Sequence, residues 1–142
     1  PLKKSKSSSP SAPKPPKTST GLGNWKARGC DVEAKDGVIT IKRNQPEAFL
    51  GVGFGSKGGA SIRFRMRSAQ AGKGTIECVH PKGESIQLPY ELSGMGWQEI
   101  SIEAPTDATF TILRIHLPKG AQQAYIDWVA LAAAARQQRW DF

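Results

Sequence analysis

The stretch that decides the fold is Ile62-Arg63-Phe64-Arg65-Met66-Arg67, in which apolar and basic residues alternate one by one. Successive side chains of a β-strand point to opposite faces, so this alternation places the apolar residues on one face and the arginines on the other. The stretch therefore predicts a strand with one face in a core and a row of guanidinium groups on the opposite face.

Short apolar runs of this kind recur along the chain from Gly21 onward, separated by segments rich in Gly, Pro, Asp and Lys, which favour turns. Only Ala130–Gln138, with its run of alanines, suggests a short helical turn. The expected strands are 25–34, 37–43, 48–54, 60–68, 74–80, 86–91, 97–103, 109–117 and 124–131. About nine strands with almost no helix predict an all-β fold, an antiparallel β-sandwich of the jelly-roll type.

Residues 1–20 differ in composition from the rest of the chain: they hold half of the 10 prolines and no acidic residue. Such a segment buries too little apolar surface to offset the entropy of ordering it, so we expect a flexible, basic Pro/Ser/Lys linker. The sandwich domain is expected over 21–142. A chain that opens on a linker and lacks an initiating Met is expected to be part of a longer protein.

The formal net charge is +8, and most of the excess lies in the linker, so the domain itself gives little indication of a nucleic-acid partner. No apolar run is long enough to predict a membrane span. The two cysteines, Cys30 and Cys78, could form a disulfide in an exported protein or remain two buried free thiols.

The sequence does not predict catalytic chemistry, and we expect a non-enzyme. Two histidines and two cysteines exclude most metal sites built from these residues. Gly53–Gly58 matches G-x-G-x-x-G, but strand-like residues follow it instead of a helix that could bind a pyrophosphate. We expect those glycines to serve a bulge and a turn. No cofactor is expected.

Calcium is the one metal that the acids could suit. Asp31 and Glu33 lie in the first expected strand and Asp127 in the last, and these carboxylates would converge if the terminal strands paired. The alternative is that these acids bind no metal and are either exposed or buried with hydrogen bonds from backbone donors. They are therefore weak candidates for a structural calcium site.

The arginine row is the strongest candidate for ligand binding. Arg63, Arg65 and Arg67 would follow one another at ~7 Å, given the rise of a strand, and neighbouring strands could add Arg114 and His116. Guanidinium forks pair bidentately with sulfate, carboxylate or phosphate, groups that an anionic polysaccharide repeats along its length. The alternative is that the arginines cover the solvent side and pair with Glu77, Glu99 or Glu103.

Aromatic rings offer a second way to bind sugar, by stacking. Trp25 and Tyr90 are the candidates, although an aromatic near the end of a domain can instead anchor a terminal strand. Trp128 lies in an apolar run and is expected in the core, and Trp97 is expected to be half-buried.

The landmarks of the domain resemble the C-terminal domain appended to arylsulfatase-type enzymes of planctomycete bacteria. The resemblance covers about residues 24–142. It is carried by Gly29–Val32, Lys35–Val38, Phe49–Gly51, Ile62–Ser68, Gly96–Glu103, Ile112–Ile115, Ile126–Leu131 and Arg139–Phe142. The formylglycine signature of the sulfatases, C/S-x-P-x-R, is missing, so no catalytic residue is carried over.

This resemblance implies an exported parent sulfatase that acts on sulfated glycans. By analogy of fold, the β-sandwich is similar in outline to carbohydrate-binding modules. We therefore expect a non-catalytic carbohydrate-binding module that holds the catalytic domain near sulfated or otherwise anionic polysaccharide. Weak binding would be enough, because tethering raises the local substrate concentration. The main alternative is a structural or partner-docking domain that binds no sugar and exposes an apolar patch. A small stand-alone enzyme and a nucleic-acid binder are further alternatives.

Overall fold

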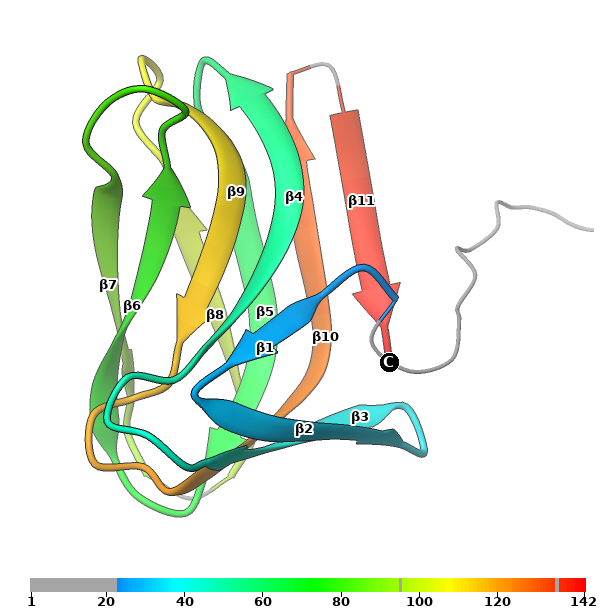
Figure 1. Cartoon of the computed structure of the whole chain (residues 1–142). Coiled ribbons are helices and arrows are strands. Elements are labelled where there is room, and N and C mark those ends of the chain that lie inside the picture. Colours follow the sequence, from blue (N-terminus) through cyan, green and yellow to red (C-terminus); the bar gives the residue numbers. More distant parts are fainter. Residues whose placement is uncertain (1–22, 95, 135) are drawn as a thin grey trace, which may run out of the picture.

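Every regular element that the structure describes is a β-strand. The structure is a computed structural model and describes residues 23–142 except Met95 and Ala135. The expected linker at 1–20 lies outside the described residues. The strands form two antiparallel sheets that pack face to face (Figure 1), which confirms the β-sandwich.

The first sheet, sheet A, contains five strands in the order β1-β4-β9-β6-β7. Their bounds are Lys26–Arg28 (β1), Phe49–Lys57 (β4), Thr109–His116 (β9), Gly72–Val79 (β6) and Ile86–Leu92 (β7). The order is not sequential, because the chain leaves the sheet and returns to it several times.

The second sheet, sheet B, has the order β2-β3-β10-β5-β8, and β11 pairs with β10. The bounds are Cys30–Lys35 (β2), Val38–Arg43 (β3), Gln123–Ala133 (β10), Ser61–Ser68 (β5), Gln98–Glu103 (β8) and Arg136–Asp141 (β11). The repeated exchange of strands between two antiparallel sheets is that of a jelly roll.

The predicted strand 25–34 is divided in two at Gly29, where the chain crosses from sheet A to sheet B. Gly29 has a positive φ of 71°. A Cβ atom there would lie 1.8 Å from the carbonyl oxygen of Glu47. Only glycine fits both the backbone conformation and this close approach.

The predicted helical turn at Ala130–Gln138 is wrong. β10 continues to Ala133, and β11 returns antiparallel to it, with Val129 opposite Trp140. The helix propensity of alanine is a weak preference, and here tertiary burial overrides it. β10 and β11 gain a ladder of backbone hydrogen bonds, and Leu131, Trp140 and Phe142 enter the core.

The core lies between the two sheets and confirms the alternation of the deciding stretch. Ile62, Phe64 and Met66 are each fully buried. The bulge expected near Gly53–Gly58 is confirmed by a register shift between Gly53 and Ser56 in the pairing of β4 with β9. In the residues described, no helix is long and apolar enough to cross a membrane.

Candidate functional site

The predicted cationic site is divided between opposite sides of the sandwich. Arg63, Arg65 and Arg67 lie on the outer face of sheet B, on β5. Arg114 and His116 lie on the outer face of sheet A, on β9. The whole core separates the two groups, so one ligand group cannot contact both, and the expectation of a single row is corrected.

On sheet B, two of the three arginines already have carboxylate partners. Arg65 donates from Nη1 to Oδ2 of Asp127 at 2.7 Å. Arg63 lies 3.6 Å from Oε1 of Glu99, and both side chains are more than half exposed, so this pair contributes little to stability. The alternative in which Glu99 pairs with an arginine is therefore confirmed for Arg63.

Aromatic rings occupy the same face, beneath the guanidinium groups. The Cζ atoms of Arg65 and Arg67 lie 5.0 and 5.2 Å from the ring centroid of Trp97. Arg67 also lies 4.5 Å from the ring centroid of Tyr125. Cation–π contacts of this kind hold the guanidinium groups against the sheet.

Trp128, which the sequence placed in the core, instead lies on this outer face. Its side chain is 9% exposed because Arg63 and Arg139 cover its ring, at 5.6 and 4.5 Å from the centroid. The register of β10 with β5 shifts between Ile126 and Trp128, so residue 128 points outward while Val129 points into the core. The apolar run Tyr125–Val129 gave no signal of this bulge.

On sheet A, a polar cluster forms around Glu77 of β6. Nε2 of His116 lies 2.9 Å from Oε1 of Glu77, and Nη1 of Arg114 lies 3.4 Å from the same oxygen. Burial alone would raise the pKa of the Glu77 carboxyl, but hydrogen bonds from His116 and Ser85 and the charge of Arg114 hold it below its usual value. The cluster therefore presents a carboxylate beside two donors.

Phe49 of β4 completes this cluster with an aromatic ring. Its centroid lies 4.9 Å from that of His116 and 4.8 Å from Cζ of Arg114. The strand pairing places Phe49 directly opposite His116. The Phe49 ring is half-buried, and it was not a candidate in the sequence analysis because nothing in its run distinguished the outer face from the inner one.

Next to Phe49, the outer face of β4 carries no side chains at Gly51, Gly53 and Gly55. A Cβ atom at Gly53 or Gly55 would meet nothing within 4 Å. Ile112, opposite Gly53 on β9, is the one large apolar side chain that is exposed among the residues described. The result is a strip of bare backbone along β4, beside the Glu77 cluster.

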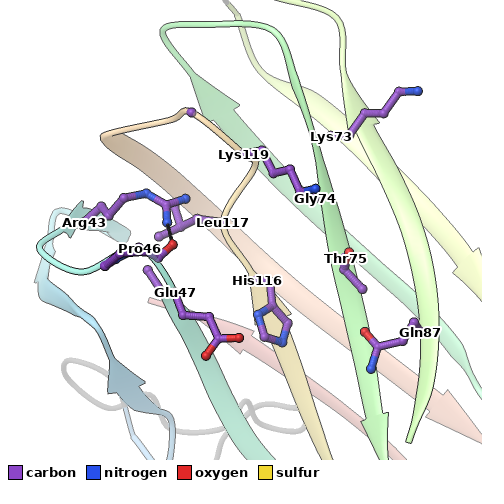
Figure 2. A pocket seen from close by; sticks show the side chains of 12 residues that line it. Arg43, Pro46, Glu47, Lys73, Gly74, Thr75, Gln87, His116, Leu117 and Lys119 are labelled. Atoms are coloured by element: carbon purple, nitrogen blue, oxygen red, sulfur yellow. Dashed lines mark hydrogen bonds between the residues drawn. The ribbon is translucent and has the colours of Figure 1, made fainter.

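His116 also lines a cleft of about 350 Å³ near the ends of β6, β7 and β9 (Figure 2). Lys73, Thr75 and Gln87 approach from β6 and β7, and Glu47 approaches from the loop before β4. Lys119 lies in the loop after β9. The cleft thus gathers amide, hydroxyl, carboxylate and ammonium groups close to the aromatic ring of Phe49.

Arg43 closes one end of this cleft and joins two loops. Its Nε donates to the carbonyl of Ala121 at 2.8 Å, and its Nη2 donates to that of Pro118 at 3.0 Å. Its Nη1 donates to the carbonyl of Pro46. Arg43 therefore fixes the walls of the cleft, a role that its position at the end of a predicted strand did not reveal.

Trp25 and Tyr90 do not present rings to a ligand, which corrects the two stacking candidates. Trp25 is 3% exposed and packs edge to face on Trp140 at 5.2 Å, which confirms the alternative of an anchored terminal strand. Tyr90 is 5% exposed, and its hydroxyl donates to the carbonyl of His116 at 2.6 Å. Tyr90 thus supports the backbone of the cleft from within.

The calcium candidates do not converge. β3 separates β2, which carries Asp31 and Glu33, from β10, which carries Asp127. The Asp127 carboxylate accepts from Arg65, as described above. Over the described part of the chain, no group of three His, Cys, Asp or Glu side chains could hold a metal ion. Asp31 and Glu33 are exposed, as the alternative expects of acids that bind no metal.

Both cysteines are buried free thiols. The sequence left open either a disulfide or two buried free thiols, and the structure shows the free thiols. Burial raises the pKa of the Cys78 thiol to about 11 and also raises that of Cys30. Neither thiol is therefore a ready nucleophile at neutral pH.

No family model matches this sequence, and no curated protein matches it. A mutant of a family 29 carbohydrate-binding module matches with a TM-score of 0.62 and 18% identity, over 78% of this chain and 81% of that chain. CBM4 matches with a TM-score of 0.62 and 12% identity, over 77% of this chain and 94% of that one. A CBM29-2 mutant complexed with cellulohexaose gives 0.59 and 16%, over 78% of both chains. At these identities the similarity shows the fold alone.

Proposed function

We propose that this chain is a non-catalytic carbohydrate-binding module and that its main site is the outer face of sheet A. The observation that carries this proposal is the cluster of Glu77, Arg114 and His116 beside Phe49, of which His116 also lines the 350 Å³ cleft. Neighbouring hydroxyls of a sugar need an acceptor and a donor at close spacing, which a carboxylate beside an imidazole and a guanidinium supplies. The Phe49 ring offers an apolar surface for the C–H face of the same sugar.

We further propose that the glycan carries sulfate or carboxylate groups. Lys73 and Lys119 line the cleft, and both side chains are exposed. Glu47 is the one acid that lines the cleft with them. An anionic group on the sugar would gain from this excess of positive charge, at a salt-dependent strength.

The solved structures support a glycan ligand and leave its charge open. The CBM29-2 mutant is complexed with cellulohexaose, a neutral hexasaccharide. Its fold is shared, which supports a glycan several sugars long as the ligand for the bare strip of β4 and the cleft together. The link to a parent sulfatase and the export of that parent rest on the sequence landmarks alone.

The docking alternative predicts an exposed apolar patch, and the described surface does not offer one. Ile112, at 36% exposure, is the single large apolar side chain exposed in the described residues. One isolated side chain is normal for a protein surface and does not mark an interface.

A steric variant tests the site without removing any polar group. Gly53→Val adds a side chain to a position that faces open space, so the fold should be retained while the bare strip of β4 is blocked. We expect affinity for a κ-carrageenan oligosaccharide, measured by calorimetry, to fall at least about tenfold in Gly53→Val and in Glu77→Gln. Arg63→Gln, on the opposite face, is the matched control and should bind as wild type.

The basic segment needs its own control. All binding measurements use the full chain with the five lysines of residues 1–20 changed to Gln, so that nonspecific attraction to polyanions is removed. Cellohexaose is measured in parallel to test for neutral ligands. Wild-type affinity in both Gly53→Val and Glu77→Gln, or no binding to either oligosaccharide, would overturn the proposal.

A further inference from the structure

Arg67 is the one arginine of the β5 row for which the described residues provide no carboxylate partner. Arg63 faces Glu99 and Arg65 faces Asp127, whereas Arg67 has only aromatic neighbours. Within the described chain it makes no side-chain hydrogen bond. A guanidinium held at a half-exposed position without a counterion retains its full capacity to bind an anion.

The surroundings of Arg67 fix its guanidinium in place before any ligand arrives. Trp97 lies 5.2 Å from Cζ on one side, at the start of β8, and Tyr125 of β10 lies 4.5 Å away on the other. Tyr125 is directly opposite Arg67 in the strand pairing. Its hydroxyl accepts a hydrogen bond from Gln123 at 2.5 Å, which holds that ring as well.

The two aromatic rings supply no carboxylate or carbonyl acceptor, so among the described residues the N–H donors of Arg67 remain without a hydrogen-bond partner. The rotamer entropy that a flexible arginine would lose on binding has already been lost on folding. The pair of rings also provides an apolar surface beside the donors.

We propose that Arg67, with Trp97 and Tyr125, forms a second glycan site on sheet B that binds a sulfate or carboxylate group of an anionic polysaccharide. The ligand class rests on the function proposed above, but the site lies on the opposite face of the sandwich. One module would then contact two polysaccharide segments and could bridge them. Multivalent attachment of this kind raises avidity without any new contact within either site.

The test follows the Nε–Hε signal of Arg67 by NMR in the full chain with its five N-terminal lysines changed to Gln. The signal is assigned by its loss in Arg67→Gln. Sulfated κ-carrageenan oligosaccharides, carboxylated oligogalacturonate and neutral cellohexaose are titrated separately. We expect a saturable shift with at least one of the two anionic probes, and which of them shifts the signal identifies the oxyanion. We expect no shift with cellohexaose.

Calorimetry in the Gly53→Val background, in which sheet A is blocked, isolates the second site. We expect residual binding of the anionic probe there, reduced about tenfold by Arg67→Gln and only partly restored by Arg67→Lys, which keeps the charge but loses the fork. Arg63→Gln, on the same strand and face, is the matched control and should leave this binding unchanged.

The outcomes separate this proposal from the function of sheet A. If Gly53→Val removes all binding and the Arg67 signal does not shift, the second site is refuted while the first stands. If Arg67→Gln lowers the midpoint of thermal unfolding and leaves the residual binding unchanged, Arg67 only joins strands and the proposal fails. If the Arg67 signal shifts in a protein whose sheet A variants bind as wild type, the second site stands without the first.

Discussion

Gly74→Ala is expected to destabilise the domain although it adds a single methyl group. Gly74 of β6 lies opposite Tyr90 of β7 in the strand pairing. A Cβ atom at residue 74 would lie 2.3 Å from Cζ and 2.4 Å from the hydroxyl oxygen of Tyr90. The ring cannot yield freely, because it is buried, packs edge to face on Phe64 at 5.3 Å, and donates to the carbonyl of His116.

The loss of stability in Gly74→Ala follows from the displacement of the Tyr90 ring and of its hydrogen bond. Overpacking a close-packed core by one methyl group costs ~1–3 kcal/mol, and the loss of the Tyr90–His116 hydrogen bond adds ~1 kcal/mol. The free energy of unfolding should therefore fall by about 2–4 kcal/mol. Tyr90→Val removes the ring and should itself cost about 3 kcal/mol.

A double-mutant cycle measured by urea denaturation isolates this clash. With the ring gone, Gly74→Ala should cost nothing further, so the two changes should be coupled by the full cost of Gly74→Ala, about 2–4 kcal/mol. Gly53→Ala is the matched control, since its Cβ atom meets open space, and it should leave the domain as stable or slightly more stable. Additive costs in the cycle, or equal costs at residues 74 and 53, would refute this account of the Gly74–Tyr90 contact.

Three further changes probe the cleft and the core. Arg43→Met should lower the free energy of unfolding by about 3 kcal/mol in urea, because the backbone carbonyls of Pro46, Pro118 and Ala121 lose their charged donor. Recovery of full stability in Arg43→Lys would contradict the role of the planar fork. Glu77→Gln should reduce the free energy of unfolding at neutral pH. The difference from wild type should shrink as pH falls below 4.5, because the folded-state pKa of Glu77 is lowered and the contribution of its carboxylate to stability is lost on protonation. A difference that stays constant from pH 7 to pH 2 would count against this. The Cys78 thiol, with its pKa raised to about 11, should react with a disulfide reagent only when urea unfolds the protein. The measurement uses Cys30→Ser, so that Cys78 is the thiol that reacts. Rapid labelling of the folded variant would contradict the prediction, because it would show that the Cys78 thiol is accessible.

The period-two pattern was sufficient to predict the sandwich. Ile62–Arg67 shows why: strict alternation leaves one possible inner face, and the core confirms it. The pattern failed where two elements share one apolar run. Residues 25–34 read as a single strand, and only the steric demand at Gly29 reveals that the chain changes sheets there. At Ala130–Gln138, local propensity and tertiary pairing disagreed, and the pairing with β10 prevailed.

The candidate site was less predictable, because a sequence shows which residues share a face of one strand but not which sheet that strand joins. Arg114 and Arg65 have equivalent patterns and lie on opposite sides of the molecule. Whether an aromatic side chain is buried likewise depends on how its strand pairs with its neighbours, which the sequence does not show. Trp128 faces outward because of a bulge near Asp127, and Tyr90 faces inward onto Phe64.

The two outer faces differ in how far the chain's own side chains cover the surfaces to which a sugar could bind. On sheet B, the rings of Trp97 and Trp128 are covered by the chain's own guanidinium groups, so a neutral sugar that stacked there would first have to displace a cation–π contact. On sheet A, Arg114 likewise contacts the Phe49 ring, at 4.8 Å from its centroid. The glycines of β4 beside that ring leave the backbone bare, so a sugar can bind there without displacing a side-chain contact. Neutral and anionic glycans should therefore separate by face: a ligand without charge can use sheet A alone, whereas an oxyanion can also use the in-plane donors of Arg67. A neutral oligosaccharide that shifted the Arg67 signal more than a sulfated one would contradict this division.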